Sequence, residues 1–337
     1  MTKYINLKLV FSFILCWASL VAVFASNYKE ECLVDNYTVI VAQDGSGDFT
    51  TIQEAIYSAK SFPYQRVEIY VKNGVYNEKV HIFSWNTHVS LIGESKEATI
   101  ISFNDYFKKI DLGRNSTFFT STVLVEGNDF IAKNLTIQNA SGPVGQAIAL
   151  SVNADRCYFE NCNFLGFQDT LYTAGEGFKQ YFKNCFIEGT TDFIFGEATV
   201  LFENCVINSK SNSYITAAST PMGQPYGYVF KNCEITADKN VTYTYLGRPW
   251  RRYAKTVFIN CSMGSHIKPE GWHNWNKPEA ENLSFYAEYN CNGKGYKPEK
   301  RVTWSHQLKK TEAKKYTKAN ILNSHTDTSK NKWYSTF

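Results

Sequence analysis

The motif FENCNF at residues 159–164 returns four more times in the next hundred residues. The later copies are FKNCFI at 182–187, FENCVI at 202–207, FKNCEI at 230–235 and FINCSM at 258–263. The spacings between their cysteines are 23, 20, 28 and 28 residues. An internal repeat in this range predicts stacked supersecondary units.

Each copy is a short alternating run rich in Phe, Ile and Val and bounded by turn residues, which is typical of a strand. Helical periodicity is missing between the copies, and the units are too short for a crossover helix. We therefore predict an all-β fold, a single-stranded right-handed parallel β-helix whose coils stack at the strand spacing of about 4.8 Å. Earlier runs such as VEIYV at 67–71 and VSLIG at 89–93 fit the same plan.

The repeat places the same two side chains at the same point of every coil. The asparagines are expected to form a ladder in which each side chain bonds turn backbone or its neighbour, and they are Asn161, Asn184, Asn204, Asn232 and Asn260. The adjacent cysteines are expected to point into the core as small hydrophobic groups. Disulfides are permitted in an exported chain, but the pairing of the eight cysteines outside the signal stays open. No CxxC spacing occurs, so we expect no metal and no cofactor.

Helical spacing is seen only near the two ends of the repeat region. TIQEAIYSA at 51–59, with Thr50 or Thr51 as N-cap, predicts a short helix that closes the open N-terminal end of the solenoid. TEAKKYTKANIL at 311–322 predicts a C-terminal helix followed by a polar tail.

The first 25 residues predict a secretory signal peptide, because two lysines precede an apolar run that ends in small residues. A membrane anchor is the alternative, but the run is short for a bilayer span. We expect one domain over residues 26–337, soluble and secreted to the extracellular space.

The charge argues against a nucleic-acid partner. Removal of residues 1–25 lowers the formal charge from +4 to +2. Residues 294–337 hold eleven Lys or Arg against three Asp or Glu, so the basic charge gathers in the tail. That tail either contacts a polyanion or forms a solvated helix face.

Two aspartates stand in apolar surroundings, Asp169 in GFQDTLY and Asp192 in TTDFIFG. They are 23 residues apart, and each lies seven residues after a repeat cysteine, so they occupy the same position on successive coils. Two stacked carboxylates with apolar neighbours cannot both ionise easily, so one should keep its proton near neutral pH. This arrangement suits a nucleophile beside a general acid. The alternative is a pair of turn aspartates that bond backbone amides.

With these motifs in place, the chain resembles the pectin methylesterases, which are carbohydrate esterases of the pectinesterase family. The resemblance runs over nearly the whole mature chain, through VAQDGSGDFTTIQEAI at 41–56, GVYNEKV at 74–80, QAIAL at 146–150, GFQDTLY at 166–172, TTDFIFGEA at 190–198, YLGRPWRRYAKTVF at 245–258, GWHNW at 271–275 and FYAEYNCNGKG at 285–295. It implies a β-helical enzyme that hydrolyses the methyl esters of galacturonate units in pectin.

The resemblance also implies roles for five residues. Asp192 matches the nucleophile that forms an acyl-enzyme anhydride, and Asp169 matches the acid that protonates departing methanol and then activates water. Gln146 and Gln168 match the amides that stabilise the oxyanion. Arg248 matches the arginine that keeps the nucleophile ionised.

Aromatic side chains in or beside the motifs are candidates for the substrate groove. Family members use such positions to stack against sugar rings, which favours a groove role over a core role for Trp250 and Trp272. Tyr172 and Phe195 fit a place in the groove or in the core equally well. The chain departs from the family's usual pattern at Ser151 and Thr191, where arginine and valine are common. These departures put the pattern of ester removal and the pH optimum in doubt, not the reaction.

The implied partner is methyl-esterified pectin, and a proteinaceous pectinesterase inhibitor is a second partner that the resemblance allows. We expect no nucleic acid, no membrane contact and a monomer, placed in the cell wall if the source is a plant. About a dozen residues separate the signal from the first strand, so no inhibitor-like pro-region is expected. Two rival functions remain: a polygalacturonate lyase or hydrolase on the same fold, and a catalytically silent wall-binding protein.

Overall fold

Each copy of the repeat folds as a strand, a corner and a second strand. In the first copy Phe159 and Glu160 end strand β11 (Cys157–Glu160), Asn161 turns the corner, and strand β12 (Asn163–Leu165) follows. Asn161 has φ 52°, in the left-handed region that asparagine tolerates better than most residues. The motif therefore spans two strands of two different sheets, where the sequence predicted one strand between turns.

All five repeat asparagines turn the corner with φ of 52–55°, as predicted, and side-chain bonds join part of the predicted ladder. The Asn161 side-chain amide donates to Asn134 Oδ1 at 2.8 Å, and Asn260 donates in the same way to Asn232 at 3.3 Å. Asn290 extends the ladder by donating to Asn260 at 2.8 Å. Where these amide-to-amide bonds form, they help to hold neighbouring corners in register.

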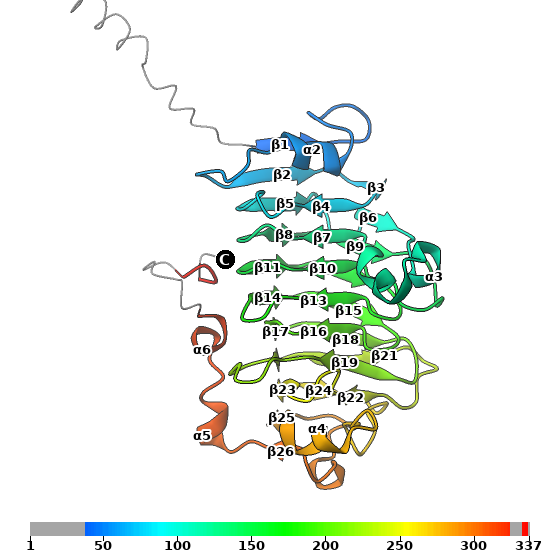
Figure 1. Ribbon diagram of the computed structural model, residues 1–337, viewed down its shortest axis with the longest axis vertical. Coiled ribbons are helices and arrows are strands. Elements are labelled where there is room, and N and C mark those ends of the chain that lie inside the picture. Colours follow the sequence, from blue (N-terminus) through cyan, green and yellow to red (C-terminus); the bar gives the residue numbers. More distant parts are fainter. Residues whose placement is uncertain (1–37, 324–331, 336–337) are drawn as a thin grey trace, which may run out of the picture. The chain divides into compact units, whose positions relative to one another are not determined.

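The computed structural model describes residues 38–323 and 332–335. The predicted signal peptide and part of the predicted polar tail lie outside these residues. Three parallel sheets wind as one β-helix, and each coil passes from sheet A to sheet B to sheet C (Figure 1). No helix among the described residues is long and apolar enough to cross a membrane.

Sheet A has eleven strands: β1 (Thr38–Val41), β2 (Val67–Val71), β5 (Val89–Gly93), β8 (Ile131–Lys133), β11, β14 (Lys179–Lys183), β17 (Thr199–Glu203), β20 (Tyr228–Lys231), β23 (Lys255–Ile259), β25 (Phe285–Tyr289) and β26 (His306–Gln307). Sheet B has eight: β3 (Gly74–Asn77), β6 (Thr99–Phe103), β9 (Thr136–Asn139), β12, β15 (Phe186–Gly189), β18 (Val206–Ser209), β21 (Glu234–Ala237) and β24 (Ser262–Met263). Sheet C has seven: β4 (Val80–Ile82), β7 (Val123–Val125), β10 (Leu150–Val152), β13 (Leu171–Thr173), β16 (Ile194–Gly196), β19 (Tyr214–Ala218) and β22 (Tyr245–Gly247).

The core consists of side-chain stacks that repeat from coil to coil. Phe159 stacks on Phe182 with ring centroids 4.4 Å apart, and the same stack continues through Phe202, Phe230 and Phe258. The repeat cysteines are buried beside it, as predicted, and all seven described cysteines are free thiols. The repeat cysteines are packing residues by their burial, and burial raises the pKa of the Cys162 thiol.

The N-terminal cap is confirmed as helix α2 (Ile52–Ser58). Thr51 is its N-cap and accepts a hydrogen bond from the Glu54 amide at 3.3 Å. Ile52, Ala55 and Ile56 are buried against the first coils. Their apolar stripe covers the end of the core that the first coil would otherwise expose.

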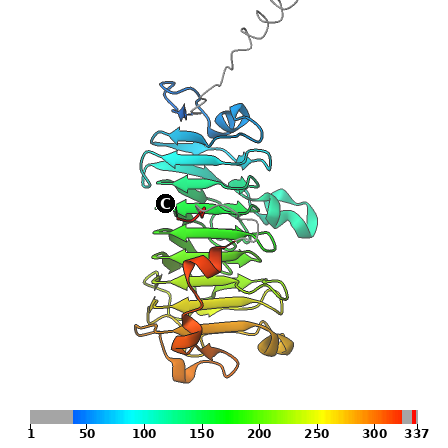
Figure 2. The ribbon, with the colours of Figure 1, turned by 90° about the vertical axis from the view of Figure 1, so that its left-hand side faces the viewer.

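The single C-terminal helix predicted over 311–322 is wrong. Two short helices form instead, α5 (Lys310–Ala313) and α6 (Lys318–Leu322), because the Thr317 side chain accepts from the Asn320 amide and starts a new helix. Ile321 and Leu322 of α6 pack on the outer face of sheet A (Figure 2).

Four further short helices are inserted between strands. They are α3 (Phe107–Ile110), η1 (Gly113–Phe119), α4 (Pro278–Leu283) and η2 (Pro298–Lys300). The sequence did not predict them. Helix α3 and η1 lie between β6 and β7 in the chain and approach sheet C, which carries the candidate site.

Candidate active site

The two aspartates lie where the chain enters sheet C on successive coils. Asp169 precedes β13 and Asp192 precedes β16, and these strands pair with Leu171 opposite Ile194. The Asp169 amide donates to the Thr191 carbonyl at 3.1 Å, which aligns the two corners. Both aspartates have positive φ, 65° and 50°. Strained backbone of this kind is concentrated at functional sites, and the predicted register of the two acids is confirmed.

Arg248 follows β22 and holds Asp192 with a two-pronged contact. Its Nε donates to Asp192 Oδ1 at 2.9 Å, and its Nη2 donates to Oδ2 at 2.6 Å. The two side chains are 17% and 8% exposed, so the pair is largely shielded from water. Such a fork fixes the plane of the carboxylate as well as its charge.

Two aromatic rings clamp the guanidinium of Arg248. Its central carbon lies 3.9 Å from the ring centroid of Tyr214 and 3.6 Å from that of Trp275. The Trp275 amide donates to His273 Nδ1 at 2.9 Å, which positions the loop that carries the indole. Neither ring was predicted from the sequence. GWHNW contains Trp275 and could have indicated it, whereas Tyr214 lies in no motif.

The surroundings set the pKa values of the two carboxyls apart. Burial raises the pKa of Asp169 well above its usual range, and the charge of Asp192 raises it further. Burial also raises the pKa of Asp192, but the hydrogen bonds and charge of Arg248 oppose that shift. These effects favour the proton on Asp169 and the negative charge on Asp192, which has Arg248 as its counter-charge.

The two predicted glutamines lie side by side on neighbouring coils. Gln146 and Gln168 are partners in an isolated parallel bridge, and the Ala147 amide donates to the Gln168 carbonyl at 3.1 Å. Gln168 directly precedes Asp169, and both glutamine side chains are half-buried. The structure thus brings two carboxamides to the corner that holds the acids.

An aromatic cluster covers the outer face of sheet C beside the acids. Tyr172 and Phe195 are register partners whose rings stack 4.7 Å apart, and Trp250 meets Phe195 edge-on at 5.8 Å. Phe118 of η1 lies 5.1 Å from Tyr172, a contact the sequence did not reveal. Phe195 is 5% exposed, so it supports the partly exposed Tyr172 and Trp250 from below.

Trp272 does not belong to this cluster, so its predicted place in the groove is wrong. It is 1% exposed and stacks on Tyr286 at 4.4 Å within the main core. The two tryptophans of GWHNW are thus split, because Trp272 turns inward and Trp275 turns toward Arg248.

The two departures from the usual family pattern also lie near the acids. Ser151 is buried between Leu124 and Tyr172, its register partners on the adjacent coils. The Thr191 hydroxyl contacts the Ser213 hydroxyl at 2.8 Å, one residue from Asp192. Within the described residues no cluster of His, Cys, Asp and Glu has the arrangement of a metal site.

The fold and this centre define a parallel β-helix enzyme with a paired-aspartate site. The model of the Pectinesterase family matches residues 38–325, and the chain belongs to that family of enzymes. Its winding is the right-handed one of that family, as predicted.

Among sequence relatives, Pectinesterase 31 of Arabidopsis thaliana is 40% identical over 283 residues, covering 82% of this chain and 89% of that protein. Pectinesterase/pectinesterase inhibitor PPE8B of Prunus persica is 40% identical over 300 residues, which cover 84% of this chain but 56% of that longer protein. Among solved structures, pectin methylesterase from carrot matches with TM-score 0.79 and 35% identity over 84% of this chain and 92% of its own. Pectin methylesterase PemA from Erwinia chrysanthemi matches with TM-score 0.74 and 31% identity over 86% and 98%.

Proposed function

We propose that this chain hydrolyses the methyl esters of galacturonate units in pectin, releases methanol and leaves free carboxylates, through an acyl-enzyme on Asp192. The observation that carries the proposal is Asp192 in the two-pronged contact with Arg248, one coil away from Asp169, whose pKa is raised by burial and by the charge of Asp192. The names of the similar proteins support the choice of pectin as substrate.

In the first half of the reaction Asp192 attacks the ester carbonyl carbon and forms a tetrahedral intermediate. As the bond to the methoxy oxygen breaks, Asp169 gives its proton to that oxygen, and methanol leaves. The product is a mixed anhydride between Asp192 and the galacturonate. A methoxide leaving group needs this proton, which is the reason for an acid of raised pKa at this position.

In the second half Asp169, now a carboxylate, removes a proton from water as that water attacks the acyl carbon. The anhydride bond breaks, and Asp192 departs as a carboxylate that Arg248 again stabilises. Asp169 ends with its proton restored, so one cycle consumes one ester and one water. The carboxamides of Gln146 and Gln168, which lie at this corner on neighbouring coils, are proposed to donate to the oxyanion of both tetrahedral intermediates.

Tyr172, Phe195 and Trp250 are proposed to form the floor of the groove, with the two more exposed rings stacking on sugar faces. We further propose that the enzyme is a secreted monomer that acts in the extracellular space without a cofactor. Relatives whose names join pectinesterase and pectinesterase inhibitor make an inhibitor protein a reasonable second partner.

The proposal is tested by incubating the mature protein with highly methylated pectin in the presence of a chelator. Methanol, new reducing ends and unsaturated products are followed together. Methanol alone is the expected result. Chain scission without methanol would assign the site to a hydrolase or lyase, and retained pectin binding with no product would indicate a binding protein.

A further inference from the structure

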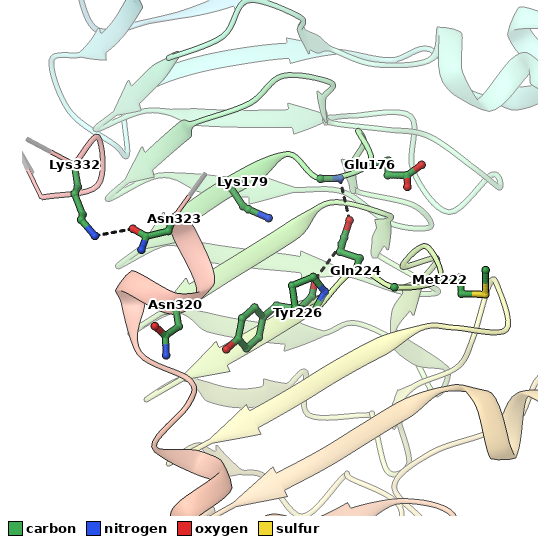
Figure 3. Close-up of a pocket in the computed structure, with 11 residues that line it drawn as sticks. Glu176, Lys179, Met222, Gln224, Tyr226, Asn320, Asn323 and Lys332 are labelled. Atoms are coloured by element: carbon green, nitrogen blue, oxygen red, sulfur yellow. Dashed lines mark hydrogen bonds between the residues drawn. The ribbon is translucent and has the colours of Figure 1, made fainter. Parts of the chain in front are cut away.

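A second cavity lies where sheet C passes into sheet A, at the far ends of the strands that start at the aspartates. Its volume is about 950 Å³, within the range of small-ligand sites. One wall is formed by loop residues 176–179 and 222–226, and the other by Asn320, Asn323 and Lys332 of the C-terminal segment (Figure 3). We call it the tail pocket. The lining residue Glu176 follows Asp169 by seven positions, which is at most about 23 Å of extended chain.

Hydrogen bonds hold the loop wall of the tail pocket in place. The Gln224 side chain, 8% exposed, accepts from the Gly177 amide and donates to the carbonyls of Glu197 and Tyr226, each at 2.9 Å. The Tyr226 hydroxyl donates to the Lys315 carbonyl at 2.9 Å and so ties the loop to the tail. These hydrogen bonds make the loop wall of the pocket preformed.

The opposite wall holds Lys332 at the rim. The Lys332 ammonium donates to Asn323 Oδ1 at 2.9 Å, and the Tyr334 hydroxyl donates to the same oxygen at 2.7 Å. Tyr334 is itself buried against the outer face of sheet A. This anchoring keeps one cationic group above the cavity, across from the loop wall.

The charges of the lining residues favour a single negative charge. Lys179, Lys332 and Glu176 are its charged members, which gives the lining a net charge of +1. Lys255 stands behind the loop wall and donates to the Gln224 carbonyl at 2.6 Å, which adds positive potential. The Asp155 carboxylate accepts from the Lys179 amide at 2.8 Å and from Arg156 at 2.7 Å, and Arg156 offsets only part of that charge because it also binds Asp129.

Lys179 is only weakly satisfied in this setting. Its half-buried ammonium, which has three donors, makes one long contact with the Thr199 hydroxyl at 3.4 Å. Burial lowers the pKa of Lys179. A desolvated cation with spare donors gains from an anion that supplies charge-assisted hydrogen bonds.

We propose that the tail pocket binds a galacturonate unit with a free carboxylate, between Lys179 and Lys332, while Asn320, Asn323 and Tyr226 contact its hydroxyls. A monoanion matches the net charge of the lining better than a phosphate dianion does. The inference rests on the proposed function for its ligand, because that reaction produces a polymer of such units beside the pocket. An enzyme held in this way stays on the chain that it has just de-esterified.

The test is a calorimetric titration with an unesterified oligogalacturonate, comparing wild type with Lys179→Met and Lys332→Met. Each substitution removes one charge-assisted contact, so the pocket affinity is expected to fall about tenfold or more. Lys300→Met is the matched control, because it removes a lysine of the same basic segment from an exposed site outside the pocket and should bind as wild type does. Thermal melts confirm that each variant is folded.

Unchanged affinity in both pocket variants would overturn the proposal. So would full displacement of the oligosaccharide by equal concentrations of acetate or phosphate, since that would indicate an anion site without sugar recognition. The ligand has no methyl ester and is not turned over, so the titration reads binding, and the part of that binding lost in Lys179→Met and Lys332→Met reads the pocket. Methanol release from methylated pectin, measured on the same preparations, reads the proposed reaction alone, and the two ideas can therefore fail separately.

Discussion

Replacing Arg248 with methionine should move the pH dependence of the reaction. Methionine keeps much of the apolar contact with Tyr214 and Trp275 but removes both hydrogen bonds to Asp192. The Asp192 carboxyl then stays buried but loses its counter-charge. Because burial is the largest effect that raises its pKa, that pKa should rise further. Because Asp192 attacks only when ionised, a higher pKa removes the active form at neutral pH.

The size of the effect follows from the burial of the pair. Breaking a buried ion pair costs about 3–5 kcal/mol. A cost of about 3 kcal/mol corresponds to about two pKa units. The acid limb of the kcat/KM profile should therefore move up by about two pH units, so activity should fall by about 100-fold at pH values below the wild-type limb and recover as the pH rises.

The assay is methanol release across a pH series, with a thermal melt at each pH. Arg301→Met is the matched control, because Arg301 forms a comparable fork with Glu288 at 2.8 and 2.9 Å in the core below the site. That variant should lose stability and keep the wild-type pH profile. An acid limb that stays in place in Arg248→Met would refute the role given to Arg248.

Two further predictions concern the acid and the tryptophans. Asp169→Asn should release little methanol yet melt higher than wild type at pH 7, because the folded protein raises the pKa of Asp169 above its unfolded value and ionisation then favours unfolding. This gain in melting temperature should vanish as the pH falls below about 4, where Asp169 is protonated in the unfolded chain as well. A variant that melts at the same temperature as wild type at pH 7 would contradict this prediction. Trp272→Ala should cost about 3–5 kcal/mol of stability with little change in KM, since Trp272 is a core residue. Trp250→Ala should raise KM for pectin with little change in melting temperature. A raised KM in Trp272→Ala and a lowered melting temperature in Trp250→Ala would instead place Trp272 in the groove and Trp250 in the core.

The repeat made most of the fold predictable. The spacing of the motif equals the length of one coil, so equivalent positions of successive copies stack on one another. The order of the strands, the shared corner of the asparagines and the register of Asp169 with Asp192 could therefore be predicted from that spacing. The split C-terminal helix could not, because an N-cap at Thr317 competes with a continuous apolar pattern over only twelve residues, 311–322.

The candidate site was predicted less evenly. Residues inside motifs, such as Arg248, came together as expected, whereas Tyr214 and Phe118 reach the site from a neighbouring coil and an inserted helix. Trp272 and Trp275 show a further limit. Three residues apart in one motif, they face opposite ways, because the chain turns through positive φ at Trp275 (57°).

The central claim is that Asp192 is the nucleophile, and its most direct test is methanol release by Asp192→Asn. Asparagine keeps the shape of the side chain and one acceptor for Arg248, so the variant should fold, with a lower melting temperature because the buried guanidinium loses its counter-charge. We predict that it releases almost no methanol from methylated pectin at any pH while still binding the polysaccharide. A folded Asp192→Asn protein that releases methanol at near wild-type rate would contradict the account.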